Sequence, residues 1–157
     1  MSDVLQRIAA QREERVRDLH LDLPIPSWDR ALIGRFKVLP RKEVEKFGQR
    51  KPGPESDADF IIRATHELYI FDASHEAEGE RMEENDDYVR LEDEHGTPIT
   101  WTAALAEKLN QSELTRSREV LEYCFGGNML AVSGFSVKLV RWMQNTDSQV
   151  AEAISGE

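Results

Sequence analysis

Two consecutive glycines, Gly126 and Gly127, divide the most apolar part of the sequence into two amphipathic halves. Apolar residues recur at helical spacing on both sides of this pair, which predicts two helices within residues 114–144. Glycine adopts the positive φ of a helix C-cap without steric strain, so the first helix is expected to end there. The side chain of Asn128 can then cap the second helix. The sequence therefore predicts a helix–Gly-Gly–helix pair with a large apolar inner surface, against which the rest of the chain packs.

Each of the two helices is expected to bury one face, because its large apolar residues recur every three, four or seven positions. In the first helix this face comprises Leu114, Leu121, Cys124 and Phe125. In the second helix it comprises Val132, Phe135, Leu139 and either Trp142 or Met143, with Lys138, Arg141 and Gln144 turned outward. The inner surface of the pair would join these two faces.

The N-terminal part of the chain shows the period of strands in place of the helical period. Alternation of apolar and polar residues predicts two strands, at 19–26 and 31–39, that form an antiparallel hairpin with Trp28 near its bend. A short helix is expected at 41–47. Residues 48–57 contain two prolines, two glycines and no apolar residue, which indicates a flexible loop.

The middle of the chain predicts a helix over 58–68 and then a short strand through Asp72. Weak alternation favours a return strand at 88–93 and another short strand at 99–101, and a helix is expected at 102–110. The predicted fold is therefore α+β and mainly α. It has a helical C-terminal part with the helix–Gly-Gly–helix pair, and small antiparallel β-hairpins in the N-terminal half.

One globular domain at 19–144 is the expected organisation of a chain of 157 residues. Residues 1–18 predict a polar helix with a sparse apolar stripe, which would be marginal alone in water. We expect this helix to be mobile unless a partner orders it. Residues 145–157 are polar and are predicted to form a flexible C-terminal tail.

The net charge of −10 is concentrated in one segment. Residues 75–94 hold ten acidic and two basic residues, a balance of −8. Blocks of like charge are usually solvated, so a loop in water is the favoured interpretation, and a docking surface for a basic partner is the alternative. Nothing in this pattern favours nucleic acid as a partner, because phosphates reward clustered Lys and Arg.

The compartment is expected to be the cytoplasm. No stretch approaches the ~20 apolar residues of a membrane span, so no membrane association is predicted. The N-terminal residues are charged and do not read as a signal peptide. The single cysteine, Cys124, lies on the predicted inner face of the helix pair, which favours a buried thiol in a reducing compartment.

Motifs of catalysis are missing from the sequence, which has no glycine-rich phosphate loop and no GxSxG elbow. His66 and Glu67 lack the second histidine of a zinc-binding HExxH motif. Asp72 and His75 can share a metal ion, and Cys124 can in principle act as a nucleophile, but a packed thiol suits its apolar face better. We therefore predict a non-enzymatic protein with no catalytic residue, no cofactor and no metal site.

The helix–Gly-Gly–helix pair also resembles a DNA-reading helix-turn-helix in the length of its turn. Its second helix displays only Lys138 and Arg141, both towards the C-terminal end, whereas recognition helices read bases near their N-terminus. The acidic charge of the chain also opposes DNA binding. An acidic DNA-binding or regulatory protein is therefore the alternative function.

The large apolar residues of the chain have two interpretations, as core anchors or as the lining of a groove for a partner helix. Tryptophan is enriched at binding hot spots, and methionine repacks easily around different partners. Trp28 shares both interpretations. The candidate partner-binding or core residues are Trp101, Phe125, Met129, Phe135, Leu139, Trp142 and Met143.

Over residues 19–144 the order of these elements resembles the tail assembly chaperones of long-tailed bacteriophages, especially those that infect actinobacteria. The most specific parts are REVLEYCFGGN at 118–128, the Leu-x-x-Trp at 139–142 and DADFIIRA at 57–64. A cysteine often follows the last of these motifs in the family, and here Thr65 or His66 takes its place, a departure that concerns packing only.

The resemblance implies a non-enzymatic factor of virion assembly. Such proteins bind the long helical tape measure protein and keep it soluble, with self-association as a further expectation. Tail tube protein then polymerises around the tape measure, and the chaperone is absent from the mature virion. A longer product made by ribosomal frameshifting near the end of the reading frame is also implied.

Overall fold

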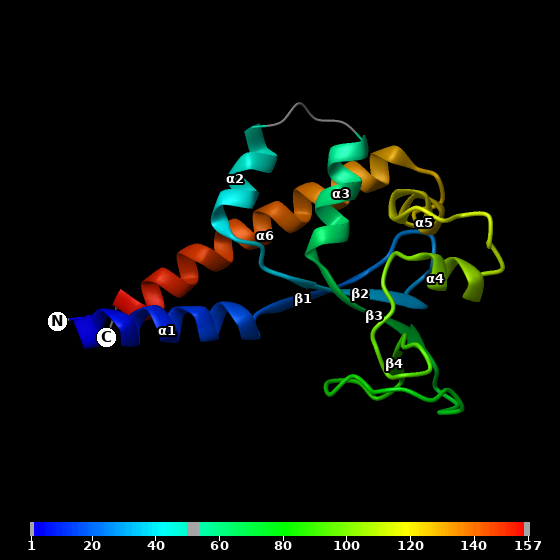
Figure 1. Cartoon of the computed structure of the whole chain (residues 1–157), viewed down its shortest axis with the longest axis horizontal. Helices are drawn as coiled ribbons and strands as arrows, with labels where there is room; N and C mark the ends of the chain where they lie inside the picture. Colours follow the sequence, from blue (N-terminus) through cyan, green and yellow to red (C-terminus); the bar gives the residue numbers. More distant parts are fainter. Residues whose placement is uncertain (1, 50–53, 156–157) are drawn as a thin grey trace.

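The computed structural model describes residues 2–49 and 54–155, and it places side chains at 3–11, 19–49 and 56–146. Within these ranges the chain forms six helices and one four-stranded antiparallel sheet. The predicted α+β class, mainly α, is confirmed. In the view of Figure 1 most of the helices lie above the sheet, and the N-terminal helix extends away from it to the left.

Ten elements follow one another along the chain. The first five are α1 (Ser2–Asp18), β1 (His20–Pro24), β2 (Leu32–Lys37), α2 (Arg41–Gln49) and α3 (Pro54–Ala64). The last five are β3 (Thr65–Phe71), β4 (Tyr88–Arg90), α4 (Ala103–Lys108), α5 (Ser117–Cys124) and α6 (Met129–Ser155).

The sheet has the order β1-β2-β3-β4, and each strand pairs antiparallel with the next. Successive side chains of a strand point to opposite faces. In β2, Leu32 and Phe36 are buried under the helices, whereas Arg35 lies on the outer face. Gly34 lies between them on the helical face, where a Cβ atom would come within 2.7 Å of the Phe36 ring. The predicted hairpin of β1 and β2 is confirmed.

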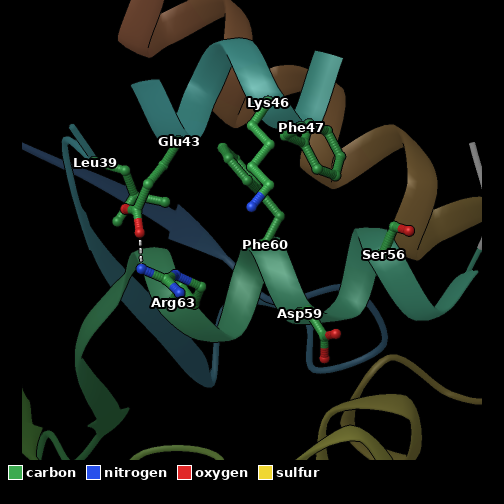
Figure 2. A pocket seen from close by; sticks show the side chains of 8 residues that line it. All are labelled: Leu39, Glu43, Lys46, Phe47, Ser56, Asp59, Phe60 and Arg63. Carbon is green, nitrogen blue, oxygen red and sulfur yellow. Dashed lines mark ion pairs between the residues drawn. The ribbon is translucent and has the colours of Figure 1, made fainter. Parts of the chain in front are cut away.

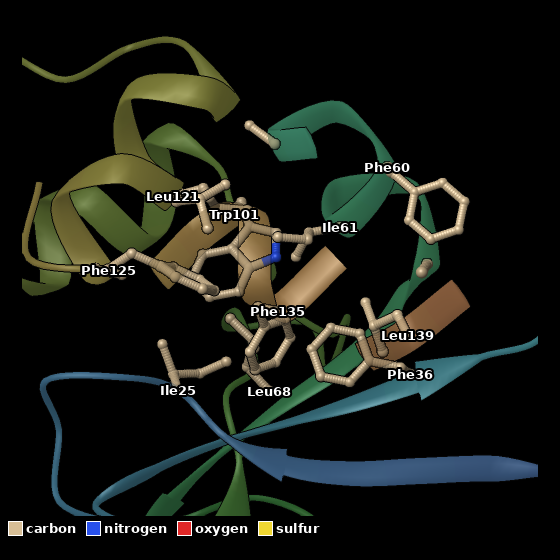
Figure 3. Packing of buried hydrophobic residues seen from close by; sticks show 14 of the residues in the cluster. Ile25, Phe36, Phe60, Ile61, Leu68, Trp101, Leu121, Phe125, Phe135 and Leu139 are labelled. Atoms are coloured by element: carbon tan, nitrogen blue, oxygen red, sulfur yellow. The ribbon is translucent and has the colours of Figure 1, made fainter. Parts of the chain in front are cut away.

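Four aromatic rings connect the layers of the core (Figure 3). Phe135 of α6 contacts Phe36 of β2 and Phe125 at the end of α5, with both pairs of ring centroids 5.2 Å apart. The ring of Trp101 lies 6.1 Å from that of Phe125. We call this set the aromatic chain. It joins the sheet to both helices of the predicted pair through edge-to-face and tilted contacts, which aromatic rings prefer.

The indole N–H of Trp101, the polar group of the aromatic chain, has a hydrogen-bond acceptor. Trp101 donates its indole N–H to Thr65 Oγ1 at 2.9 Å, and Thr65 donates its hydroxyl to the carbonyl of Ile61 at 2.6 Å. A buried donor without an acceptor would cost about 1–3 kcal/mol. These two bonds therefore fix Trp101 against the end of α3 and the start of β3.

The helix–Gly-Gly–helix pair is present as predicted. Gly126 and Gly127 have φ values of 70° and 69°, the left-handed region in which glycine is unstrained. The side-chain oxygen of Asn128 accepts hydrogen bonds from the backbone N–H groups of Leu130 and Ala131 at 3.0 and 3.2 Å. The first arm is shorter than the apolar pattern, because α5 starts at Ser117.

Two boundaries in the middle of the chain differ from prediction. The helix predicted over 58–68 ends at Ala64, because Thr65 already pairs with Phe36 of β2. It also begins at Pro54, inside the predicted loop 48–57, where proline fits because a first-turn residue needs no amide donor. Residues 48–49 of the predicted loop belong to α2, and residues 50–53 lie outside the described residues.

Two further predictions are wrong. Residues 99–101 form no strand; the backbone of Ile99 bonds to Leu91 and the chain then turns inward at Trp101. Helix α6 continues to Ser155, so no break separates it from the tail predicted at 145–157. The residues after 144 contain no glycine or proline before Gly156, which leaves no stop signal for the helix.

Helix α1 contacts α6, and the start of α1 lies close to the end of α6 at one end of the molecule (Figure 1). The predicted polar helix is confirmed in its extent, Ser2–Asp18. Val4, Leu5 and Ile8 remain exposed on it, by 52%, 65% and 41%.

Two leucines of α6 test which of its faces is buried. Leu139 is completely buried, whereas Leu130 is 85% exposed. Leu139→Ala is expected to lower the free energy of unfolding by about 2–5 kcal/mol, because it leaves a cavity in the core. Leu130→Ala should change it by less than about 0.5 kcal/mol. Urea denaturation followed by circular dichroism measures both, and equal effects would contradict the orientation of α6.

Candidate functional site

An apolar hollow of about 430 Å³ opens at the end of the sheet, between α4 and the turn that joins β1 to β2. Eight of its nine lining residues are apolar and one, Lys108, is charged. The lining consists of Trp28, Ala31, Leu32, Ile70, Phe71, Leu91, Leu105, Lys108 and Leu109. Ligand sites in proteins are concave and mostly apolar in this way.

Trp28 forms one wall of the hollow and is held by its polar end. Its indole N–H donates to the carbonyl of Cys124 at 2.7 Å, at the end of α5. That carbonyl has no partner further along the helix, because the last carbonyls of a helix lack intrahelical donors. The bond therefore satisfies both groups and leaves the apolar face of the indole towards the hollow.

Phe71 stands at the mouth of the hollow, at the end of β3, and is 53% exposed. Its ring makes an edge-to-face contact with Tyr88, with centroids 5.5 Å apart. Tyr88 is itself fixed, because its hydroxyl donates to the carbonyl of Arg30 at 2.9 Å. An exposed aromatic ring that is held in place loses little conformational freedom on binding, which suits it to be an anchor for a partner.

The remaining wall comes from the predicted helix at 102–110, which is observed as α4. Leu105 is buried beneath the hollow, and Leu109 packs partly against the core. Asn110 ends this segment with a φ of 59°, a left-handed conformation that asparagine tolerates. Lys108 is exposed at the rim.

The segment 72–87, which we call the acidic loop, follows Phe71 directly. It overlaps the run 75–94 that was predicted to be solvated, and most of its side chains are exposed, but both ends and the middle are anchored. Asp72 accepts hydrogen bonds from the backbone of Ala77 and from Arg81, and these lower the pKa of Asp72 to about 2. Met82 is buried, with 6% of its surface exposed.

Ion pairs attach the acidic loop to the outer face of the sheet. Arg35 of β2 binds Asp22 of β1 at 2.9 Å and Glu84 of the loop at 3.0 Å, and only 12% of its side chain is exposed. The Arg35 guanidinium also lies over the ring of Tyr69, 5.1 Å from its centroid. The hydrogen bonds that Arg35 donates to the Asp22 carboxylate raise the pKa of Arg35 above its usual value.

A second group of charges lies beside it on the same face. Burial raises the pKa of Glu67, but hydrogen bonds from Arg90 and Tyr69 outweigh this effect and lower the pKa overall. Arg90 reaches Glu67 at 2.6 Å and Glu92 at 3.2 Å. These carboxylates are paired with cations and give no proton donor or acceptor poised for chemistry.

The metal pair considered in the sequence, Asp72 and His75, does not form, because Asp72 is bound to Arg81. His75 instead lies 3.4 Å from Asp87, and Asp86 completes a group whose ligand atoms are within 4.8 Å of one another. The group is largely exposed, on one loop. Exposed carboxylates of this kind do not by themselves define a metal site.

A smaller cleft of about 120 Å³ lies between α2 and α3 (Figure 2). Its floor is the stacked pair Phe47 and Phe60, with ring centroids 4.3 Å apart. Three of its four charged lining residues are engaged in ion pairs: Glu43 binds Arg63, and Asp59 binds Arg118 of α5. Lys46 is the fourth. The cleft has room for only a few water molecules, since each occupies about 30 Å³.

The candidate residues named from sequence separate into two sets. Five lie in the core and are at most 8% exposed: Trp101, Phe125, Phe135, Leu139 and Met143. Met129 and Trp142 are partly buried against that core, so Met143 and not Trp142 completes the inner face of α6. Of the tryptophans, Trp28 lines the hollow. Sequence reasoning placed Trp28 at the bend but did not connect it with Phe71 or Leu109.

The helix-turn-helix alternative can also be located in the structure. Lys138 and Arg141 are exposed on α6, as predicted. The exposed side of the same helix also carries Leu130 and Val137, the second of which is 44% exposed. Its first turns present no cation to a base or a phosphate.

No family model, curated protein or solved structure matches the chain. Among the described residues, no helix combines the length and the apolar character that crossing a bilayer requires. The site is therefore interpreted from its own geometry: a preformed apolar hollow with an exposed aromatic ring at its mouth, next to an anchored acidic loop.

Cys124 provides a test of the packed-thiol interpretation. It is fully buried, and burial raises its pKa to about 12 from 9.0. At about pH 8 a thiol reagent should modify the folded chain far more slowly than the denatured chain, because the thiolate is the reactive form. A fast reaction of the folded protein would contradict this.

The same group predicts a pH dependence. The unfolded thiol ionises near pH 9, whereas the folded thiol stays neutral to about pH 12. Its stabilising contribution is therefore complete below pH 9 and is lost as the pH rises between these values. Denaturant unfolding above pH 9 should show a smaller loss of stability in Cys124→Ala than in the parent chain, and an equal loss would count against the assignment.

Proposed function

We propose that this protein is a tail assembly chaperone of a long-tailed bacteriophage. It binds the tape measure protein in the host cytoplasm, keeps it soluble during assembly of the tail tube, catalyses no reaction and is absent from the mature virion. The observation that supports the proposal best is the preformed apolar hollow with Phe71 at its mouth. The resemblance of residues 19–144 to the family supplies the identity of the partner.

A tape measure protein must expose long apolar helix before the tube encloses it, and exposed apolar surface aggregates. A groove that accepts the apolar face of a helix can cover this surface while leaving the polar face in water. The hollow has the composition such a groove needs, and Trp28 and Phe71 offer two fixed aromatic surfaces. The net charge of −10 would keep the coated complex soluble by mutual repulsion.

Release of the chaperone from the tape measure protein needs no energy source. Modest affinity at each hollow is sufficient when many copies bind along one filament. Tail tube protein then displaces the chaperone by binding the tape measure more tightly. Self-association would strengthen the coating, and the exposed Val4, Leu5 and Ile8 of α1 offer one apolar surface for it.

Variants at the mouth of the hollow test this proposal. Phe71→Ser removes the exposed ring, and Ala31→Arg places a charge where Ala31 is exposed at the lining. Both should strongly reduce the amount of soluble tape measure protein recovered on co-expression, because the apolar contact is lost. Leu130→Ser, which removes an exposed side chain that does not line the hollow, is the matched control and should leave recovery unchanged.

Circular dichroism and the unfolding midpoint establish that each variant is folded. Equal recovery with all three variants would contradict the hollow as the binding site. Failure of the parent chain to bind tape measure protein would contradict the function itself.

A further inference from the structure

We infer that the segment bound in the hollow is an amphipathic helix whose apolar face is flanked by Lys or Arg. This inference rests on the proposed function and specifies the partner chemistry of the same site. It is carried by the position of the acidic loop, which begins at the mouth of the hollow and holds carboxylates that form no ion pair with the described residues.

Several carboxylates of the acidic loop have no cation of their own. Glu76, Glu78 and Glu83 are exposed, and no ion pair joins them to another residue in the described part of the chain. The loop holds eight acidic residues and one arginine between 72 and 87, a balance of −7 out of the −10 of the chain. A partner that brings positive charge would meet this field first.

The loop and the hollow are joined by short connections. Phe71 lines the hollow, and the next residue, Asp72, donates its backbone N–H to the carbonyl of Asp87 at 2.6 Å. Tyr88, which contacts the Phe71 ring, closes the loop at its other end. Both ends of the acidic loop therefore start at the edge of the hollow where the aromatic ring is exposed.

The anchors of the loop also matter for affinity. Arg81 holds Asp72, and Arg35 holds Glu84 on the outer face of the sheet. Because these pairs fix the loop before any partner arrives, binding does not have to order it. The paired carboxylates serve the fold, and the unpaired ones remain for the partner.

Lys108 supports the opposite charge pattern, an acidic flank on the partner. It is the one charged residue in the lining, on the α4 side of the hollow. Its neighbour Glu107 is also exposed. The negative charge of Glu107 cancels the positive charge of Lys108, so together they give this side of the rim no net charge. The three unpaired carboxylates of the acidic loop, Glu76, Glu78 and Glu83, outweigh the single positive charge of this lysine. The basic flank of the helix would face the loop, and its other flank would lie over α4.

Three synthetic helical peptides with one common apolar face test the inference. Their flanking positions carry Lys, Gln or Glu, and each is titrated into the full chain by calorimetry. We expect the Lys peptide to bind about tenfold more tightly than the Gln peptide at low salt, since several modest exposed ion pairs add up. The Glu peptide should bind most weakly, and added salt should reduce the differences.

Matched charge variants locate the effect. The triple variant Glu76→Gln, Glu78→Gln, Glu83→Gln removes three charges from the acidic loop and should weaken the Lys peptide about tenfold while leaving the Gln peptide unchanged. The triple variant Asp3→Asn, Glu113→Gln, Glu122→Gln removes three charges elsewhere. It should change the affinity for the Lys peptide less than about twofold, because none of the three residues lines the hollow or belongs to the acidic loop.

The outcomes separate this inference from the function on which it rests. Tightest binding of the Glu peptide, or equal binding of all three, overturns the basic flank but leaves the hollow as the docking site, provided Ala31→Arg abolishes binding. An equal effect of the two triple variants also overturns it. If none of the three peptides binds, the hollow fails as a docking site and the inference fails with it.

Discussion

The contact of Phe135 with both Phe36 and Phe125 is the interaction on which the rest of the structure depends. One ring of α6 lies against the sheet on one side and against the end of α5 on the other, at 5.2 Å in each case. Because the glycine turn follows Phe125 immediately, this contact fixes the position of that turn against the sheet. The Cys124 carbonyl at the end of α5 is then in place to accept the hydrogen bond from the Trp28 indole N–H. Removing the aromatic chain would therefore separate the helix pair from the sheet and displace one wall of the hollow.

Polar and apolar groups are distributed unevenly around that core. The polar group of Trp28 and that of Tyr88 each donate a hydrogen bond to a backbone carbonyl. The side-chain surface that remains at the end of the sheet is therefore apolar. The outer face of the sheet is closed differently, by Arg35 and Arg90 with their carboxylates. One end of the molecule is thus apolar and concave while the adjoining loop is strongly negative. This combination supports the proposed capture of an apolar helix by the hollow.

The sequence predicts the helix pair well because its signals are local: two glycines, a capping asparagine and a regular apolar period. It fails where the outcome depends on distant partners. The helix predicted over 58–68 stops early because Thr65 bonds to Trp101 and pairs with Phe36, and neither contact is visible in the local pattern. Arg35 and Glu84 are 49 residues apart, so the anchoring of the acidic loop could not be inferred from its composition. The hollow could not be predicted from local patterns either, because its lining residues come from four separate segments of the chain.

The most direct test of the account is a nuclear magnetic resonance titration of the full chain, with methyl-labelled leucine, valine and isoleucine, against a segment of the tape measure protein. The account predicts that the largest shifts fall on Leu91, Leu105 and Leu109, which line the hollow. Shifts confined to Leu130 and Val137 on the outer side of α6, with the methyl groups of the hollow unaffected, would contradict it.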